Sequence, residues 1–212
     1  MKNIPPVSLL LSNRVRLLTA ALVLGALPAS LVHAAPDTKP VDANLVINGS
    51  LEAPNATKDY ALGWAKARGG KVSWLAEAGD HFIRLESTEP GKMVSIYHPV
   101  ALQGAKAVEL TVKARVTGLV RGDQSWFDAR VMSNFRDAGG AEIKSASKPI
   151  AFGKDTDGWV ERKVVMTVPE GAVMLAILPT LLNVNAGTMD ITEVKLLAVE
   201  PPAAAPAPAA KP

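Results

Sequence analysis

The stretch SWFDARVMSNFR, residues 125–136, alternates between apolar and polar side chains along most of its length. Because successive side chains of a β-strand point to opposite faces of a sheet, the pattern predicts a strand with one buried face. The inward face would carry Phe127, Ala129, Val131, Ser133 and Phe135. The outward face would carry Trp126, Asp128, Arg130, Met132, Asn134 and Arg136.

The outward face places an aromatic ring beside charged and amide groups. A ring-shaped polar ligand such as a sugar is held by an apolar platform and a few well-placed hydrogen-bonding groups. We therefore predict a carbohydrate-binding surface made of Trp126, Asp128, Arg130 and Asn134. The alternative is a solvated strand face on which Asp128 and Arg130 pair with neighbouring strands.

The rest of the chain has the same strand character. Short apolar or alternating runs follow one another, separated by Gly, Pro, Asn and Asp. The expected strands are residues 45–47, 72–76, 81–87, 93–99, 107–116, 125–136, 142–150, 159–168, 173–182 and 188–198. Short, evenly spaced strands are typical of sandwiches and jelly rolls. The predicted fold class is an all-β, antiparallel β-sandwich of the jelly-roll type.

Residues 107–116 alternate regularly between apolar and polar side chains. If this strand pairs with residues 125–136, Lys113 and Arg115 would lie beside the predicted carbohydrate surface. Arg115 is therefore added to the candidate binding residues. Further candidates for the same cleft, near the end of an expected strand, are Tyr97 and His98.

The first 34 residues have the three parts of a secretory signal peptide. A basic start is followed by the apolar run LLTAALVLGAL at residues 17–27, and Val32-His33-Ala34 offers a small-residue cleavage signal. The run is shorter than the roughly 20 residues that a membrane-spanning helix needs. We expect cleavage after Ala34, a secreted or periplasmic protein, and no membrane insertion.

Three segments follow the signal peptide. Residues 35–43, APDTKPVDA, form a short linker, and residues 44–199 form the β-sandwich domain. Residues 200–212, EPPAAAPAPAAKP, are a Pro/Ala-rich tail without core-forming side chains, which we expect to be disordered.

The charge of the mature chain is balanced. Three of the 23 Lys and Arg residues precede the cleavage point, which leaves 20 against 20 Asp and Glu. A neutral chain argues against nucleic acid as a partner. The chain has no cysteine, and only two histidines follow residue 34, so a zinc site is disfavoured.

Several motifs occur together and in order. They are NLVINGSLE (44–52), GW (63–64), AGDHFIRLES (78–87), VELTVKARV (108–116), GWVERKVVMTVPEGA (158–172) and GTMDITEVKLL (187–197). In this order they resemble the CenC-type carbohydrate-binding modules, cellulose- and xylan-binding jelly rolls of the galactose-binding-like superfamily. The resemblance implies the same fold and binding of a poly- or oligosaccharide.

The resemblance also assigns roles to individual residues. It implies that Trp64 and Trp159 are packing landmarks, and Trp74 is expected in the core, which leaves Trp126 as the sugar-stacking platform. Family members often hold a structural calcium through an early glutamate and a closing aspartate, which correspond to Glu52 and Thr192. Thr192 supplies no charge, so weaker calcium binding is expected. The alternative is that Glu52 pairs locally.

Catalysis has little support in the sequence. There is no G-x-S-x-G, no H-E-x-x-H and no phosphate-binding glycine loop. Nothing places two carboxylates across a cleft, as glycoside hydrolysis requires. The expected function is a secreted, non-catalytic carbohydrate-binding module, at most an accessory to a glycoside hydrolase on another chain. The alternative is an envelope or extracellular β-sandwich that binds a protein partner or is structural.

Overall fold

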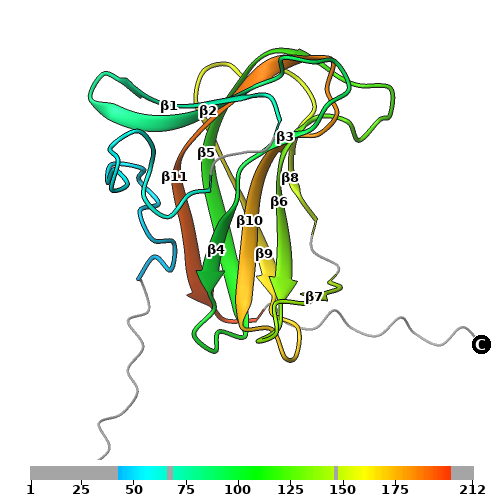
Figure 1. Cartoon of the computed structure of the whole chain (residues 1–212). Coiled ribbons are helices and arrows are strands. Elements are labelled where there is room, and N and C mark those ends of the chain that lie inside the picture. Colours follow the sequence, from blue (N-terminus) through cyan, green and yellow to red (C-terminus); the bar gives the residue numbers. More distant parts are fainter. Residues whose placement is uncertain (1–42, 66–68, 146–147, 202–212) are drawn as a thin grey trace, which may run out of the picture. The chain divides into compact units, whose positions relative to one another are not determined.

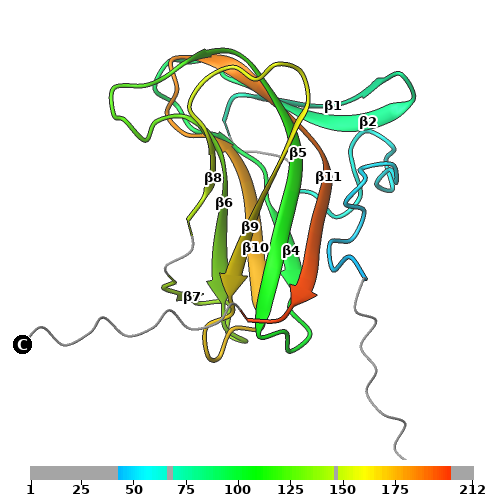
Figure 2. The same cartoon turned by 180° about the vertical axis from the view of Figure 1, so that it is seen from behind.

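The computed structural model describes residues 43–65, 69–145 and 148–201. These residues form two antiparallel sheets that face each other (Figures 1 and 2). The five-stranded sheet has the order β1 (Lys71–Glu77), β2 (Asp80–Glu86), β11 (Ala186–Val199), β5 (Ala107–Val120) and β9 (Val160–Thr167). No helix occurs among these residues, so the predicted all-β sandwich is confirmed.

The six-stranded sheet is built around two long strands, β10 (Met174–Leu181) and β6 (Ala129–Arg136). The short strands β3 (Val94–Ser95) and β4 (His98–Ala101) pair with β10. The short strands β7 (Glu142–Ile143) and β8 (Ile150–Phe152) pair with β6. Two predicted strands, 93–99 and 142–150, are thus each divided into two.

The expected signal peptide, most of the linker, and the tail from residue 202 onward lie outside the described residues, so these assignments stay predictions. Within the described ranges, no helix is long and apolar enough to cross a membrane.

The core lies between the two sheets. The inward residues of β5 are fully buried, as the alternation of residues 107–116 predicts. Burying one such aliphatic side chain stabilises the fold by about 1.5–3 kcal/mol. The core residues of the three central strands are Val108, Leu110, Val112, Ala114, Val116, Ala129, Val131, Phe135, Leu175, Ile177 and Leu181.

Strand β6 begins at Ala129, later than the predicted start at residue 125. Residues 125–128 belong to a loop, in which Phe127 donates a backbone hydrogen bond to Gln124 at 3.0 Å. From Ala129 onward the predicted alternation is confirmed, because Ala129, Val131 and Phe135 are buried.

Residues 107–116 and 125–136 do not pair, so the condition that would have placed Lys113 and Arg115 beside the predicted carbohydrate surface is not met. β5 pairs with β11 and β9, whereas β6 pairs with β10, β7 and β8. The connection between β5 and β6 crosses from one sheet to the other. The crossing lets the apolar faces of both strands point into the same core.

The segment before β1, residues 43–65, contains no strand, so the predicted strand at 45–47 is wrong. It docks instead against an irregularity in β11, where the register shifts between Thr192 and Lys195. The backbone N–H of Leu45 donates to the Leu196 carbonyl at 2.9 Å. The backbone N–H of Val194 donates to Gly49 at 2.8 Å. The motif NLVINGSLE therefore fastens this segment to the last strand.

Candidate functional site

A groove of about 580 Å³ lies on the outer face of the five-stranded sheet, whose strands β2, β11, β5 and β9 are in the foreground of Figure 2. Its walls include Phe82 from β2, Lys113 and Arg115 from β5, and Trp159, which directly precedes β9. The β1–β2 turn, residues 77–80, forms one rim. We refer to this site as the outer-sheet groove.

One wall of the groove is aromatic. The rings of Phe82 and Trp159 meet edge to face, with their centroids 5.7 Å apart. The guanidinium of Arg115 lies 4.6 Å from the centre of the Trp159 ring, within cation–π range. Trp159 is half-buried and lies outside the hydrophobic core, so it lines the groove instead of packing between the sheets. The family resemblance had implied a packing role for Trp159, so the sequence analysis did not include it among the binding residues.

A buried carboxylate holds Arg115, one of the groove's lining residues, in place. Asp190, on β11, accepts hydrogen bonds from Arg84 Nε at 2.7 Å and Arg84 Nη2 at 2.8 Å. Arg115 Nη2 donates to the same carboxylate at 2.8 Å, and Arg115 Nη1 also pairs with Glu77 at 2.9 Å. The hydrogen bonds from Arg84 to Asp190 raise the pKa of Arg84. Charged side chains held from two sides are pre-organised, so Arg115 keeps a fixed position in the groove.

A further ion pair lines the groove. Lys113 Nζ lies 2.5 Å from Glu193 Oε1. The hydrogen bond between them lowers the pKa of Glu193 and raises the pKa of Lys113. Both groups are therefore charged at neutral pH.

The carbohydrate surface predicted from the sequence is divided by the structure. Trp126 lies in the loop before β6 with 55% of its surface exposed, whereas Asp128 is buried. Arg130 Nε donates to Asp128 at 2.6 Å, and Arg130 Nη2 donates to the Trp126 carbonyl at 2.5 Å. Asp128 and Arg130 thus pair with each other and not, as the alternative interpretation had expected, with a neighbouring strand. Arg115 belongs to the other sheet and does not join them.

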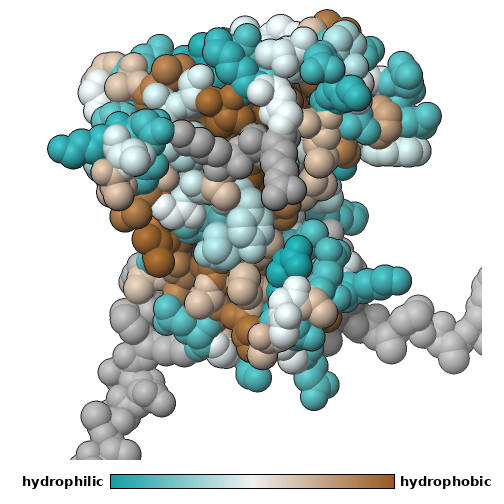
Figure 3. Space-filling view, in the orientation of Figure 1, coloured by the Kyte–Doolittle hydropathy of each residue, from teal (hydrophilic) through white to brown (hydrophobic). Residues whose placement is uncertain are grey.

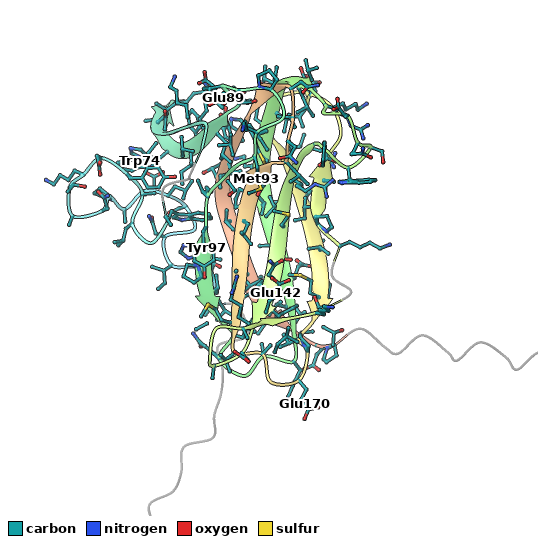
Figure 4. The ribbon with its side chains drawn as sticks, turned by 45° about the vertical axis from the view of Figure 1, so that its right-hand side comes forward. Trp74, Glu89, Met93, Tyr97, Glu142 and Glu170 are labelled. Carbon is teal, nitrogen blue, oxygen red and sulfur yellow. The ribbon has the colours of Figure 1, made fainter. Side chains whose placement is uncertain are left out.

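The outer face of the six-stranded sheet carries two of the remaining candidates, Asn134 and Tyr97. Figure 3 shows apolar as well as hydrophilic side chains on this face, and Figure 4 places Met93, Tyr97 and Glu142 along it. Asn134 donates to Glu142 at 3.1 Å. His98 is buried, with its ring centroid 4.6 Å from that of Trp64, so it belongs to the core and not to a cleft.

The two residues matched to a calcium site, Glu52 and Thr192, meet at His81. Glu52 accepts the His81 backbone N–H at 2.8 Å, and its other oxygen lies 2.7 Å from His81 Nδ1. Thr192 Oγ1 donates to the His81 carbonyl at 2.9 Å. The hydrogen bonds from His81 hold the pKa of Glu52 below its usual value. The imidazole also stacks on Trp74, with centroids 4.4 Å apart, beside the segment before β1 (Figure 4).

These contacts do not fit a calcium site. Calcium takes six to eight oxygen ligands, and affinity rises with the number of carboxylates. Here a single carboxylate has both oxygens engaged by His81. Among the residues that the structure describes, no group of three or more His, Asp or Glu side chains is arranged to hold a metal ion.

We expect the melting temperature to be the same in calcium and in chelator, because the Glu52–His81–Thr192 contacts already join the segments that calcium would join. Differential scanning calorimetry in 5 mM calcium, 5 mM magnesium and EDTA checks this, with magnesium as the control for general ionic effects. A rise specific to calcium and reversed by EDTA would contradict it.

Comparison with known proteins identifies the fold. No protein-family sequence model matches the chain, and no curated protein matches it in sequence. Among solved structures, the tandem CBM22-1–CBM22-2 domain of Paenibacillus barcinonensis Xyn10C is 19% identical, with a TM-score of 0.52 over 84% of this chain and 51% of that chain. The enzymatically active domain of bacteriophage CBA120 tailspike protein 4 is 16% identical, with a TM-score of 0.54 over 74% of this chain.

The chain spans about a fifth of the tailspike chain, since the match covers 21% of it. Other structural neighbours are carbohydrate-binding modules of families 16, 61, 4 and 22. At 19% and 16% identity, the likeness to the Xyn10C and tailspike domains shows the β-sandwich fold. No family sequence model matches the chain, so the narrower CenC-type assignment is not confirmed.

Proposed function

We propose that the protein is a non-catalytic carbohydrate-binding module that takes a poly- or oligosaccharide in the outer-sheet groove. The proposal is supported chiefly by one observation: an aromatic wall, Phe82 and Trp159, faces fixed charged groups in a concave site. Sugars present both apolar C–H faces and hydroxyl groups, so this combination suits them. The structural likeness to the CBM22 tandem domain of Xyn10C supports the same function class.

The surface around Trp126 is the second candidate location for the same function. Its indole is exposed, but Asp128 and Arg130 are engaged with each other and with the loop backbone. A sugar there would find one aromatic ring and few available hydrogen-bonding groups. We therefore favour the outer-sheet groove.

Binding without hydrolysis is the better-supported activity. A glycosidase needs a carboxylic acid whose pKa is raised so that it can donate a proton. In the groove, the pKa of Glu52 and the pKa of Glu193 both move downward. We also propose export, as residues 1–34 predict, so that the protein meets its glycan outside the cytoplasm.

Replacing Trp159 by alanine is expected to weaken glycan binding at least about tenfold, because anchoring aromatic residues typically contribute more than 1 kcal/mol to an interface. The measurement is a glycan-array and polysaccharide pull-down screen, followed by titration calorimetry on the best ligand. Trp126→Ala serves as the matched control, since it removes an exposed tryptophan outside the groove.

Thermal melts of both variants separate lost binding from lost folding. If Trp126→Ala abolishes binding and Trp159→Ala does not, the surface predicted from the sequence is the site. If the folded wild-type protein binds no glycan, carbohydrate binding is wrong and the protein-partner alternative replaces it.

A further inference from the structure

His81, near the start of β2, lines the outer-sheet groove and is held in place on several sides. Its backbone N–H donates to Glu52 at 2.8 Å, and its carbonyl accepts a hydrogen bond from Thr192 Oγ1 at 2.9 Å. Its Nδ1 lies 2.7 Å from the other carboxylate oxygen of Glu52. Both the backbone and the imidazole of His81 are therefore fixed at the wall of the groove.

The ring on which this imidazole stacks is itself anchored. The rings of Trp74 and His81 have their centroids 4.4 Å apart and lie 18° from parallel. The indole N–H of Trp74 donates to the Leu51 carbonyl at 3.0 Å, and Trp74 packs against the hydrophobic core. The imidazole would lose the stacking contact if it rotated, so its outer edge keeps one orientation.

The contact with Glu52 decides which imidazole nitrogen carries the proton. The hydrogen bonds from His81 hold the pKa of Glu52 below its usual value, so this carboxylate is ionised at neutral pH and can only accept hydrogen bonds. Nδ1 is therefore the donor to Glu52. In a neutral imidazole one nitrogen donates and the other accepts, which makes Nε2 of His81 an acceptor.

This acceptor is open to a ligand. In the part of the chain that the structure describes, Nε2 of His81 has no hydrogen-bond partner, and the side chain is 30% exposed. The histidine nitrogen that is buried without a partner among these residues is Nε2 of His98, which no ligand can reach. A sugar hydroxyl in the groove can donate to Nε2 of His81.

The charged groups of the groove are less available. Lys113 pairs with Glu193, and Arg115 pairs with Glu77 and Asp190. A hydroxyl that bonds one of these groups competes with a charge-assisted hydrogen bond, which is about twice as strong as a neutral one. A hydrogen bond to Nε2 of His81 displaces only water, and the imidazole is already ordered before the ligand arrives.

We infer that His81 is a ligand-binding residue of the outer-sheet groove, where its Nε2 accepts a hydrogen bond from a hydroxyl group of the bound glycan. Glu52 is the positioning residue, because it holds the tautomer that leaves Nε2 without a proton. The inference rests on the proposed function, since it assigns one contact in the same groove. Glu52 and Thr192, which the family resemblance matched to a calcium site, hold His81 in this arrangement.

A measurement on the protein without ligand tests the tautomer. At about pH 8, where histidine side chains are ordinarily neutral, long-range proton–nitrogen NMR spectra are expected to show His81 with a protonated Nδ1 and an unprotonated Nε2. In Glu52→Gln the amide can also donate to Nδ1, so the other tautomer is expected to gain population. The matched control is Glu109→Gln, a carboxylate that does not line the groove, and it is expected to leave the spectrum of His81 unchanged.

Titration calorimetry tests the contact with ligand, using cellohexaose, xylohexaose and any glycan that the wider screen retains. His81→Asn is expected to lower the affinity about three- to tenfold, as for the loss of one hydrogen bond. Asparagine can still donate to Glu52 from the position of Nδ1, but it places no acceptor at the position of Nε2. Glu109→Gln is again the control and is expected to keep the affinity.

A second readout does not depend on the variant being folded. When a glycan binds to the wild-type protein, the nitrogen resonance of Nε2 in His81 is expected to move toward lower frequency, whereas that of Nδ1 stays in place. Thermal melts show whether His81→Asn is folded, and the NMR readout takes the place of the variant where it is not.

The outcomes separate this inference from the proposed function. A protonated Nε2 in the neutral wild-type imidazole, unchanged affinity in a folded His81→Asn, or an Nε2 resonance that does not move on binding would overturn the inference and leave carbohydrate binding intact. An equal loss of affinity in Glu109→Gln would also overturn it, since the effect would not be specific to the groove. If no glycan binds, the proposed function itself is overturned, and this contact with it.

Discussion

Replacing Asp190 by alanine is expected to lower the free energy of unfolding by about 3 kcal/mol, because it leaves two arginines without the buried carboxylate that neutralises them. Asp190 is 1% exposed and accepts hydrogen bonds from both Arg84 and Arg115. Breaking a buried ion pair by removing one partner costs several times more than losing an exposed pair. Urea unfolding monitored by tryptophan fluorescence measures the change.

The control for this prediction is Glu109→Gln, which removes the partner of Lys163 on the same face of the same sheet. Lys163 is 64% exposed, so the loss is expected to stay below about 1 kcal/mol. Asp190→Asn is expected to fall between the two, since it keeps the shape of the side chain but not the charge. A loss below about 1 kcal/mol in Asp190→Ala would show that the arginines find other partners or water.

Replacing Gly49 by alanine is expected to cost about 3 kcal/mol and to lower the melting temperature by roughly 10 °C. A Cβ atom at this position would lie 2.1 Å from the Val194 carbonyl oxygen and 2.9 Å from Asn44 Nδ2. The nearest atom is backbone, which cannot rotate away. The segment would have to move off β11 and lose the hydrogen bond from Val194 N–H to the Gly49 carbonyl.

Gly153→Ala is the matched control, because a Cβ there meets no atom within 4 Å and the residue has no left-handed backbone conformation. Its melting temperature is expected to stay within about 2 °C of the wild type, as for other surface substitutions. If Gly49→Ala melts like Gly153→Ala, the docking of this segment on β11 does not stabilise the fold.

The elements of this fold are largely local properties of the sequence. The alternation in residues 107–116 predicts the buried and exposed faces of β5, and turn residues mark most strand boundaries. Residues 45–47 mislead because Leu45 and Val46 are apolar but pack against β11 from a loop. Residues 125–128 mislead because the alternation continues through Asp128, although β6 begins only at Ala129 and the Asp128 side chain pairs with Arg130.

The candidate site depended on partners that are far apart in sequence. Trp159 and Phe82 were both visible as aromatic residues, but only the order β2–β11–β5–β9 brings them to one groove. The signal that marked them was weak: Trp159, directly before β9, was matched to a packing landmark, and Phe82 lies within β2 in the motif AGDHFIRLES without an assigned role. Arg115 was selected from the sequence, yet for a surface on the wrong sheet.

The sequence by itself determined the fold class, because strand periodicity, turn residues and the order of motifs are all local or sequential. Only the tertiary structure decided which strands share a sheet, because β5 and β6 satisfy the same apolar pattern whether they pair or face each other across the core. The tertiary structure also decided which charged groups meet at the outer-sheet groove. Charges act over distance in space, and Lys113 and Arg115 have Glu193 and Asp190 as partners some 75–80 residues away.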